Sequence, residues 1–293
     1  MSKNFTYAVL MHAIELYKFD GDLRPVLEHI RANTNPNSKR LKRDLAKLHR
    51  FVQTGQAQFS VWTIGNDKLD FLSFSALPGG QFCPGKGECA KFCYSYKAWR
   101  NFTPFARQLQ NSVLLDTEGG REQIRQQLDL QLKKRRFRNR EVEMRLYVDG
   151  DFRHQEDIDF WFETIAERPT LKVYGYSKSL NLFRNLWVTG GFVPDNYILN
   201  LSEGGRYDHI HDFLLAANIP WVRGRFVAVP GVRKRMKDIT KADIRYMVQW
   251  AKEKYGPDSK NVVCPGKCGS CTKIGHICGS PKFKGYNVLI STH

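Results

Sequence analysis

Residues 71–94 read FLSFSALPGGQFCPGKGECAKFCY, an apolar run followed by a loop rich in cysteine and glycine. The apolar part, residues 71–76, predicts a β-strand. The loop then carries Cys83, Cys89 and Cys93 within eleven positions. Glycine allows backbone conformations that turn such thiols toward one point, so this spacing is typical of a metal-binding loop. Three unrelated buried thiols are the alternative. The stretch therefore predicts a metal centre directly after a strand.

Outside this loop, strand-like and helix-like segments alternate along the chain. Strands are expected at 58–64, 69–76, 141–148, 171–176, 196–201, 221–229 and 286–291. Helices are expected at 102–115, 121–134, 156–168, 180–188, 207–217 and 241–255. Repeated strand–helix units imply a parallel sheet covered by helices, and six units suit a partial barrel better than a closed one. The predicted fold class is α/β, with a partial (βα)6 barrel-like parallel sheet.

The pattern of the sequence divides the chain into three parts. Residues 1–56 are expected to form an N-terminal helical and basic extension, residues 57–256 the partial barrel, and residues 257–293 a cysteine-rich metal-binding tail with the last strand. Within the extension, apolar residues at helical spacing predict helices at 5–19, 23–32 and 38–52.

The 293-residue chain has a formal net charge of +17, which favours an anionic partner. Nucleic acid is the commonest such partner, because basic side chains displace the counterions of its phosphates. A soluble basic protein without such a partner is the alternative. The residues expected to contact phosphates form two groups, Arg40, Lys42, Arg43 and Lys47 in one predicted helix and Arg135, Arg136, Arg138 and Arg140 in the densest basic segment.

No apolar segment approaches the roughly 20 residues that a membrane-spanning helix needs, and the N-terminus lacks the pattern of a signal peptide. We therefore expect a cytoplasmic protein without a membrane partner. The chain contains neither GxGxxG nor GxxxxGK[ST], so an ordinary dinucleotide or nucleoside-triphosphate site is unsupported.

Polar residues follow each predicted strand of the sheet. In parallel α/β folds, ligands bind at the carboxyl ends of the strands. Asp149-Gly150-Asp151 follows the strand at 141–148, and Ser202-Glu203 follows the strand at 196–201. Asp149 and Asp151 are candidate catalytic residues, as an acid–base pair or as partners of ribose hydroxyls. The alternative is a plain turn, which Asp-Gly favours.

The remaining cysteines lie near the end of the chain with the spacing Cys-x3-Cys-x2-Cys-x6-Cys. They are Cys264, Cys268, Cys271 and Cys278. Four converging thiolates close a tetrahedral zinc site or hold a [4Fe–4S] cluster, and the spacing does not separate these two outcomes. Replacement of one cysteine by His276 is a weaker alternative.

The cysteine loop supplies only three thiols, Cys83, Cys89 and Cys93. A metal centre there is therefore expected to keep a vacant position for a substrate or cofactor.

A partial βα barrel with a three-cysteine loop after its first strand resembles the radical S-adenosylmethionine (AdoMet) enzymes. The resemblance implies a [4Fe–4S] cluster at the loop whose open iron binds AdoMet, and a second cluster at the tail. It also implies AdoMet-binding roles for Gly150, Ser202 and Glu203, and Phe92 matches the aromatic residue before the last cysteine of the family motif. The loop spacing here is Cys-x5-Cys-x3-Cys instead of CxxxCxxC, and Asp149-Gly150-Asp151 stands in place of a Gly-Gly-Glu segment.

The chain from Leu72 to His293 also resembles a group of phage and plasmid proteins. They share a CPG…C…C-Tyr loop, a Gly-Asp-Phe turn and a cysteine-rich tail that ends in His. This resemblance brings no activity with it.

Three functions are compatible with these observations. The first is an iron–sulfur enzyme of radical-AdoMet type that acts on or binds nucleic acid. The second is a nucleic-acid-binding protein of a mobile element, in which zinc or an iron–sulfur cluster is structural. The third is a nuclease in which Asp149, Asp151 and Glu203 hold a hard divalent cation.

Overall fold

The computed structural model describes residues 7–36, 38–65 and 69–292. Phe5, at the start of the first predicted helix, and His293, at the end of the tail, lie outside these ranges. The side chain of Phe92 is also outside the description, so its match to the family motif stays a prediction.

The described residues form one open, mostly parallel sheet with the strand order β1-β2-β3-β4-β5-β6-β8-β7. The strands are β1 (Thr63–Ile64), β2 (Phe71–Ser73), β3 (Val142–Leu146), β4 (Leu171–Ser177), β5 (Tyr197–Ser202), β6 (Val222–Val229), β7 (Asn261–Val263) and β8 (Asn287–Ser291). Only the pairing of β1 with β2 is antiparallel among these described strands. The predicted α/β class with a parallel sheet is therefore confirmed, whereas its closure toward a barrel stays a prediction.

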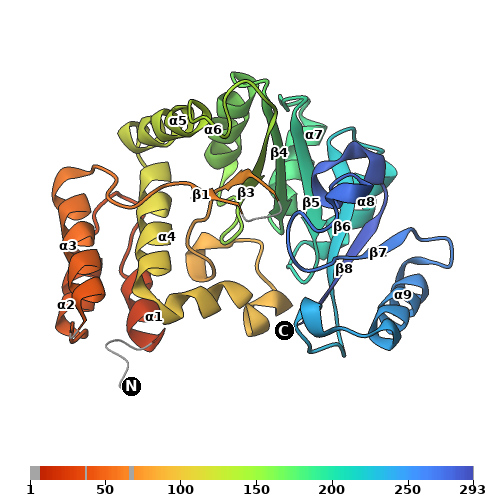
Figure 1. Ribbon diagram of the computed structural model, residues 1–293, viewed down its shortest axis with the longest axis horizontal. Helices are drawn as coiled ribbons and strands as arrows, with labels where there is room; N and C mark the ends of the chain where they lie inside the picture. Colours follow the sequence, from red (N-terminus) through yellow and green to blue (C-terminus); the bar gives the residue numbers. More distant parts are fainter. Residues whose placement is uncertain (1–6, 37, 66–68, 293) are drawn as a thin grey trace.

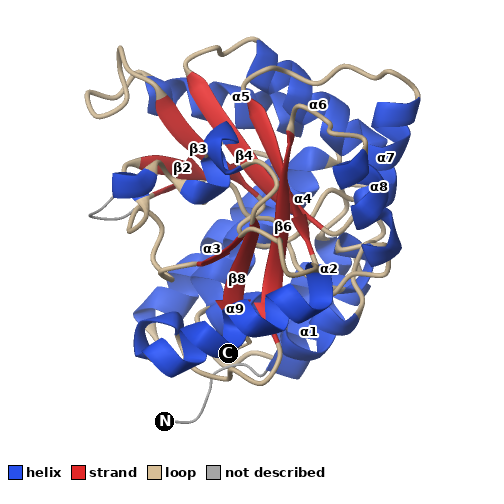
Figure 2. Ribbon diagram, turned by 90° about the vertical axis from the view of Figure 1, so that its right-hand side faces the viewer, coloured by secondary structure: helices blue, strands red, loops and turns tan. Residues whose placement is uncertain are grey.

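The helices connect the strands in the predicted order. They are α1 (Tyr7–Glu15), α2 (Arg24–Ala32), α3 (Lys39–Thr54), α4 (Phe102–Leu115), α5 (Glu118–Leu132), α6 (Gln155–Ala166), α7 (Leu180–Val188), α8 (His211–Ala216) and α9 (Lys241–Tyr255). The helices α1, α2 and α3 lie at one end of the molecule, and α9 and β7 lie at the other (Figure 1). The crossover helices α6, α7 and α8 follow one another along the same side of the sheet (Figure 2).

The two faces of the sheet are covered by different parts of the chain. Successive residues of a strand point to opposite faces, and on β4 they enter different hydrophobic cores. Val173 belongs to the large core, which also holds Leu10 of α1 and Leu48 of α3. Tyr174 belongs to a smaller core with Cys278 of the tail. The N-terminal helices thus share a core with the helix-covered face, and the cysteine-rich tail packs on the other face.

Two strand predictions differ from the structure. The strand expected at 58–64 is reduced to β1, because the backbone N–H groups of Gln58 and Phe59 donate to the side chain of Gln110 on α4 instead of to a neighbouring strand. β7 was not predicted. It has only three residues, too few for an alternating pattern to be recognised. Among the described residues, no helix combines the length and the apolar character needed to cross a membrane.

Candidate functional site

The cysteine loop lies across the carboxyl ends of the central strands and is fixed there by backbone hydrogen bonds. The N–H of Cys89 donates to the carbonyl of Gly204 at 3.0 Å, and the N–H of Arg206 donates to the carbonyl of Gly85 at 3.0 Å. The loop consists of short 3-10 turns, Gly80–Phe82, Glu88–Phe92 and Tyr94–Arg100, that follow β2. It therefore reaches from the end of β2 to the residues after β5.

The glycines of the loop serve two different purposes. Gly79 and Gly80 have positive φ angles of 73° and 49°, as a turning role requires. Gly85 is needed for close contact instead, because a Cβ there would lie 2.3 Å from the backbone of Lys178. A Cβ at Gly87 would lie 2.8 Å from the backbone of Gly205. The prediction that glycine turns the loop therefore applies only to its first half.

All three loop cysteines line one cavity of about 160 Å³. The same cavity is lined by every rim residue that the sequence singled out, namely Asp149, Gly150, Asp151, Ser202 and Glu203. No fourth cysteine and no histidine occurs among the described residues that line it. The three loop cysteines thus border one cavity together with the predicted rim residues.

The thiols that line the cavity do not converge on one point. In the part of the chain that the structure describes, no three Cys, His, Asp or Glu side chains converge closely enough to hold one metal ion. A [4Fe–4S] cluster attaches each thiolate to a different iron, so its ligands stand farther apart than those of one zinc ion. Burial raises the pKa of the Cys83 thiol, and the charges of Asp151, Cys93 and Cys89 raise it further.

Asp151 is held by the ends of two strands. Its carboxylate accepts hydrogen bonds from the Ser177 hydroxyl at 2.7 Å and from the N–H groups of Lys178 and Phe152 at 2.8 Å each. Burial raises its pKa, and these hydrogen bonds oppose the shift. Asp151 therefore ties the residues after β3 to those after β4, with both oxygens occupied.

Asp149 and Glu203 are also occupied by neighbouring donors. Asp149 accepts from Gln108 at 2.9 Å, and burial raises its pKa. Glu203 accepts from Lys254 and Tyr255 at 2.6 Å each, so it connects the end of β5 to α9. Gly150 packs against the backbone of Ala76, where a Cβ would lie 3.1 Å from the carbonyl oxygen. These predicted site residues border the cavity, and each has a structural contact.

Sequence reasoning missed the basic side chains of the cavity. Lys86 comes from the loop, Arg145 from β3 and Lys178 from the end of β4. The Lys178 ammonium donates to the Ser202 hydroxyl. Lys86 stands in the quoted loop, and Lys178 directly follows the β4 strand, so the positions of both in the sequence could have indicated them. Arg145 lies inside a strand, and nothing local indicated that its face borders a cavity.

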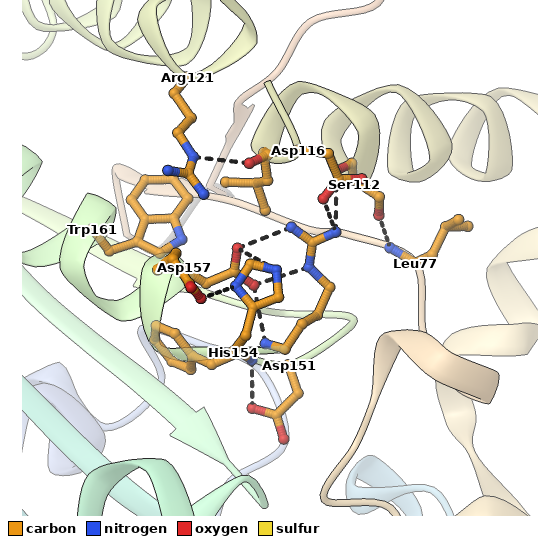
Figure 3. Close-up of polar contacts among 12 residues, drawn as sticks. Leu77, Ser112, Asp116, Arg121, Asp151, His154, Asp157 and Trp161 are labelled. Carbon is orange, nitrogen blue, oxygen red and sulfur yellow. Dashed lines mark hydrogen bonds and ion pairs between the residues drawn. The ribbon is translucent and has the colours of Figure 1, made fainter. Parts of the chain in front are cut away.

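The turn that carries Asp149 and Asp151 is anchored by a buried ion-pair network around Arg153. Its guanidinium donates to Asp116, at the end of α4, and to Asp157, in α6. Figure 3 shows Asp116, Asp157 and Ser112 around this turn, with His154 beside them. His154 pairs with Glu156 at 2.9 Å and stands 3.9 Å from Asp157, away from the residues that line the cavity.

The four tail cysteines lie together on the face of the sheet opposite the crossover helices. The backbone N–H of Cys264 donates to Leu289 of β8 at 2.9 Å, and the carbonyl of Cys278 accepts from Asn200 of β5 at 3.1 Å. Burial raises the pKa of Cys264 to about 11, and the charges of Cys278, Cys268 and Cys271 add to the shift.

The four thiols have the donor types of a four-thiolate centre, although within the described residues they do not converge on one metal position. The Nδ1 of His276 faces Glu143 Oε2 at 3.2 Å, a contact that does not involve Nε2, so replacement of one cysteine by His276 stays an alternative. Zinc and a [4Fe–4S] cluster both match four thiols. The seven cysteines remain predicted metal ligands.

The two basic segments lie away from the cavity. The segment with Arg136 and Arg140 precedes β3 and so stands at the amino edge of the sheet, where both side chains pair with Asp70 at 2.7 and 3.0 Å. On α3, Arg40 donates to Thr103 at 3.0 Å, and Lys47 stands 5.7 Å from the centre of the Phe59 ring. The exposed members of these two segments are Arg40, Lys42, Arg43, Lys47, Arg135, Arg136, Arg138 and Arg140.

The fold and the site define an α/β protein with an open, mostly parallel sheet and a cysteine-lined cavity at the carboxyl ends of its strands. The model of the Gene product 88 (GP88) family matches residues 37–278, which is more than half of the chain, and the chain belongs to this family. The match is consistent with the resemblance to phage and plasmid proteins. No curated protein and no solved structure matches the chain.

Proposed function

We propose that this protein is an iron–sulfur enzyme of radical-AdoMet type, in which Cys83, Cys89 and Cys93 hold a [4Fe–4S] cluster with one open iron. The observation that carries the proposal is the position of these thiols. All three face one cavity at the carboxyl ends of parallel strands, and no fourth cysteine or histidine is among its described lining residues. Three thiolates leave one iron of such a cluster without a protein ligand.

A cluster held by these three thiols would supply the single electron needed for reductive cleavage of AdoMet to methionine and a 5′-deoxyadenosyl radical. The chain's own residues would bind and orient the reactants. Lys86 and Lys178 bring positive charge to the cavity and are suited to a carboxylate or phosphate. Asp151 holds the segments that follow β3 and β4 together. Gly150, Ser202 and Glu203 remain the proposed contacts for AdoMet.

The nuclease is not our proposal. A hard divalent cation needs several oxygen ligands, with carboxylates prominent among them. In the structure, Asp149, Asp151 and Glu203 already accept hydrogen bonds from Gln108, Ser177 and Lys254 respectively. These contacts already use part of the acceptor capacity that a cation would need. The same contacts weaken the assignment of Asp149 and Asp151 as an acid–base pair.

Nucleic acid remains a proposed partner on the evidence of the exposed basic residues. They favour phosphate binding, but the segment from Arg135 to Arg140 lies at the sheet edge opposite to the cavity. We infer that such binding is separate from the chemistry of the cavity. Replacing Arg135 and Arg138 by Gln should weaken binding to a mixed-sequence duplex and reduce its salt dependence, and unchanged binding would contradict this role.

Anaerobic reconstitution tests the proposed enzyme. Protein supplied with iron and sulfide should show iron–sulfur absorbance and, on reduction with dithionite, should convert AdoMet to 5′-deoxyadenosine and methionine. Cys89→Ser should abolish this cleavage. Asp258→Asn, at an exposed position, is the control and should leave the loop cluster and the cleavage unchanged. A reconstituted protein whose loop binds no iron, or which does not cleave AdoMet, would overturn the proposal.

A further inference from the structure

Two arginines beside the cysteine tail have few charged partners: Arg223 is buried, and Arg145 is partly buried. Arg223 is 1% exposed, and its guanidinium donates to the Asn200 side chain and to the carbonyls of Tyr286 and Arg225, at 2.8 and 2.9 Å. Arg145 lies over the Tyr176 ring at 4.6 Å, and its enclosed Nε has no acceptor. Within the described residues, neither guanidinium forms an ion pair with Asp or Glu.

An unbalanced guanidinium in the interior is costly, because it loses its hydration without gaining an opposite charge. The same chain shows the usual solution at Arg153, which pairs with Asp116 and Asp157. The nearby carboxylate of Glu143 does not play this part for Arg145, because it faces His276. The charge of Asp149 acts on Arg145, whereas among the described residues no carboxylate acts on Arg223, whose charge partners are Cys278 and Tyr176. The two guanidiniums together therefore leave positive charge that a further anion would offset.

The tail cysteines stand where that anion is needed. Arg145 Nη1 lies 3.8 Å from the sulfur of Cys268. Arg223 reaches Cys278 through one residue, since Asn200 accepts from the guanidinium and donates to the Cys278 carbonyl at 3.1 Å. Each cysteine that is tied to an arginine belongs to the four-cysteine group.

We propose that Arg145 and Arg223 are the counter-ions of a dianionic centre in which Cys264, Cys268, Cys271 and Cys278 all bind metal as thiolates. Four thiolates around Zn²⁺, or around a [4Fe–4S] core of charge two plus, leave a net charge of two minus. Two guanidiniums balance that charge. A centre with three thiolates and neutral His276 would have a net charge of only one minus. The inference rests on the metal centre proposed for the tail and is independent of AdoMet chemistry at the loop.

The position of Arg145 also connects this centre to the cavity. Its side chain lines the cavity and contacts Cys268, and Tyr176 lines the cavity and contacts Cys278. The tail centre therefore lies directly behind the cavity wall. Loss of its charge should disturb the position of Arg145, and with it the wall that faces the loop cysteines.

The inference can be tested with the tail thiols alone in a loop-serine protein, in which Cys83, Cys89 and Cys93 are replaced by serine. The measured quantity is the binding of zinc to this protein. One zinc per chain is expected, released slowly to a chelator. Arg145→Met and Arg223→Met should each release zinc about tenfold faster, the size typical of a lost partner of metal ligands. Arg145→Lys, which keeps the charge, should stay closer to the parent. Arg168→Met is the control, because Arg168 pairs with Asp129 far from the tail in sequence.

A double-mutant cycle keeps the test decisive if an arginine variant folds poorly. In the metal-loaded full chain, Arg145→Met should lower the midpoint of thermal unfolding. In a tail-serine protein, with all four tail cysteines replaced, the same substitution should be neutral or raise the midpoint, because the arginine there has no anion to balance. Equal losses in both backgrounds, or unchanged zinc release, would overturn the inference. A tail without metal in a protein that still cleaves AdoMet would overturn it alone and leave the proposed function standing.

Discussion

The guanidinium of Arg153 lies 2.6 Å from the carboxylate of Asp116, and the two side chains are 3% and 4% exposed. The same guanidinium contacts Asp157 at 2.9 Å, so one cation joins the end of α4 to the first turn of α6. Arg153 directly follows the turn of Asp149 and Asp151 that lines the cavity. The cavity wall is therefore held in place by ion pairs that are shielded from solvent.

Replacing Arg153 by Met should destabilise the protein strongly. The substitution leaves Asp116 and Asp157 buried without their partner, and breaking a buried ion pair from one side typically costs about 3–5 kcal/mol. Chemical denaturation followed by circular dichroism measures the free energy of unfolding.

Arg168→Met is the matched control for this prediction. Arg168 pairs with Asp129, whose side chain is 45% exposed, so its loss should cost about 1 kcal/mol. Equal losses in the free energy of unfolding would show that the buried ion pairs of Arg153 stabilise the protein no more than the more exposed pair of Arg168 does.

Gly85→Ala should displace the cysteine loop. The new methyl group would lie 2.3 Å from the backbone of Lys178, so one of the two segments must move. Movement of the loop strains the hydrogen bond from Arg206 to Gly85, and movement of Lys178 strains its bond to Asp151. We expect a destabilisation of about 1–3 kcal/mol, as in other cases of overpacking, together with loss of iron from the loop after reconstitution.

Gly119→Ala provides the comparison, because nothing lies within 4 Å of its added methyl group. Gly119 is in α5, where alanine should be neutral or stabilise by up to about 1 kcal/mol. Iron content should stay at the wild-type level. Full iron binding by Gly85→Ala would refute the close-contact role that we assign to this glycine.

The sequence predicted the order of elements and the rim of the cavity because both depend on local patterns. Helices α4, α7 and α9 begin and end at the predicted residues, since apolar periodicity and capping residues are encoded within each segment. The loop cysteines and Asp149 meet in one cavity because parallel strands bring their carboxyl ends to one edge.

The parts that sequence could not supply depend on distant segments. Arg145 alternates with core residues of β3, and its face borders a cavity only because the tail, more than a hundred residues later, packs beside it. Glu203 was assigned to a cofactor, yet its carboxylate meets Lys254 of α9. The place of the Arg135–Arg140 segment could have been found, because a segment that precedes a strand lies at the amino edge.

The stability of the protein should respond to pH through Asp149. Burial raises its pKa above the ordinary value of 3.8, so the folded protein takes up a proton more readily than the unfolded chain. This contribution to stability is fully present below about pH 3.8 and is lost as the pH rises through the raised value. Relative to Asp149→Asn, which cannot titrate, the wild type should lose stability over that interval.

Urea denaturation of both proteins between pH 4 and pH 7 measures this difference in the free energy of unfolding. Asp258→Asn, at an exposed position, controls for the substitution itself. A difference that grows in favour of the wild type as the pH rises would mean that hydrogen bonds from Gln108 outweigh burial and lower the pKa of Asp149.

Metal binding at the tail should release protons and strengthen with pH. Burial raises the pKa of Cys264 to about 11, so this thiol is protonated at neutral pH in the metal-free protein and must lose its proton to bind metal. Calorimetric titration of the metal-free loop-serine protein with zinc, in buffers of different ionisation enthalpy, counts the protons released. Because its pKa lies near 11, Cys264 should release its proton on metal binding both at pH 7 and at pH 9, and the affinity should rise with pH between these values. Cys264→Ser should release fewer protons at pH 7, and an equal count in both proteins would show that Cys264 is ionised before metal arrives.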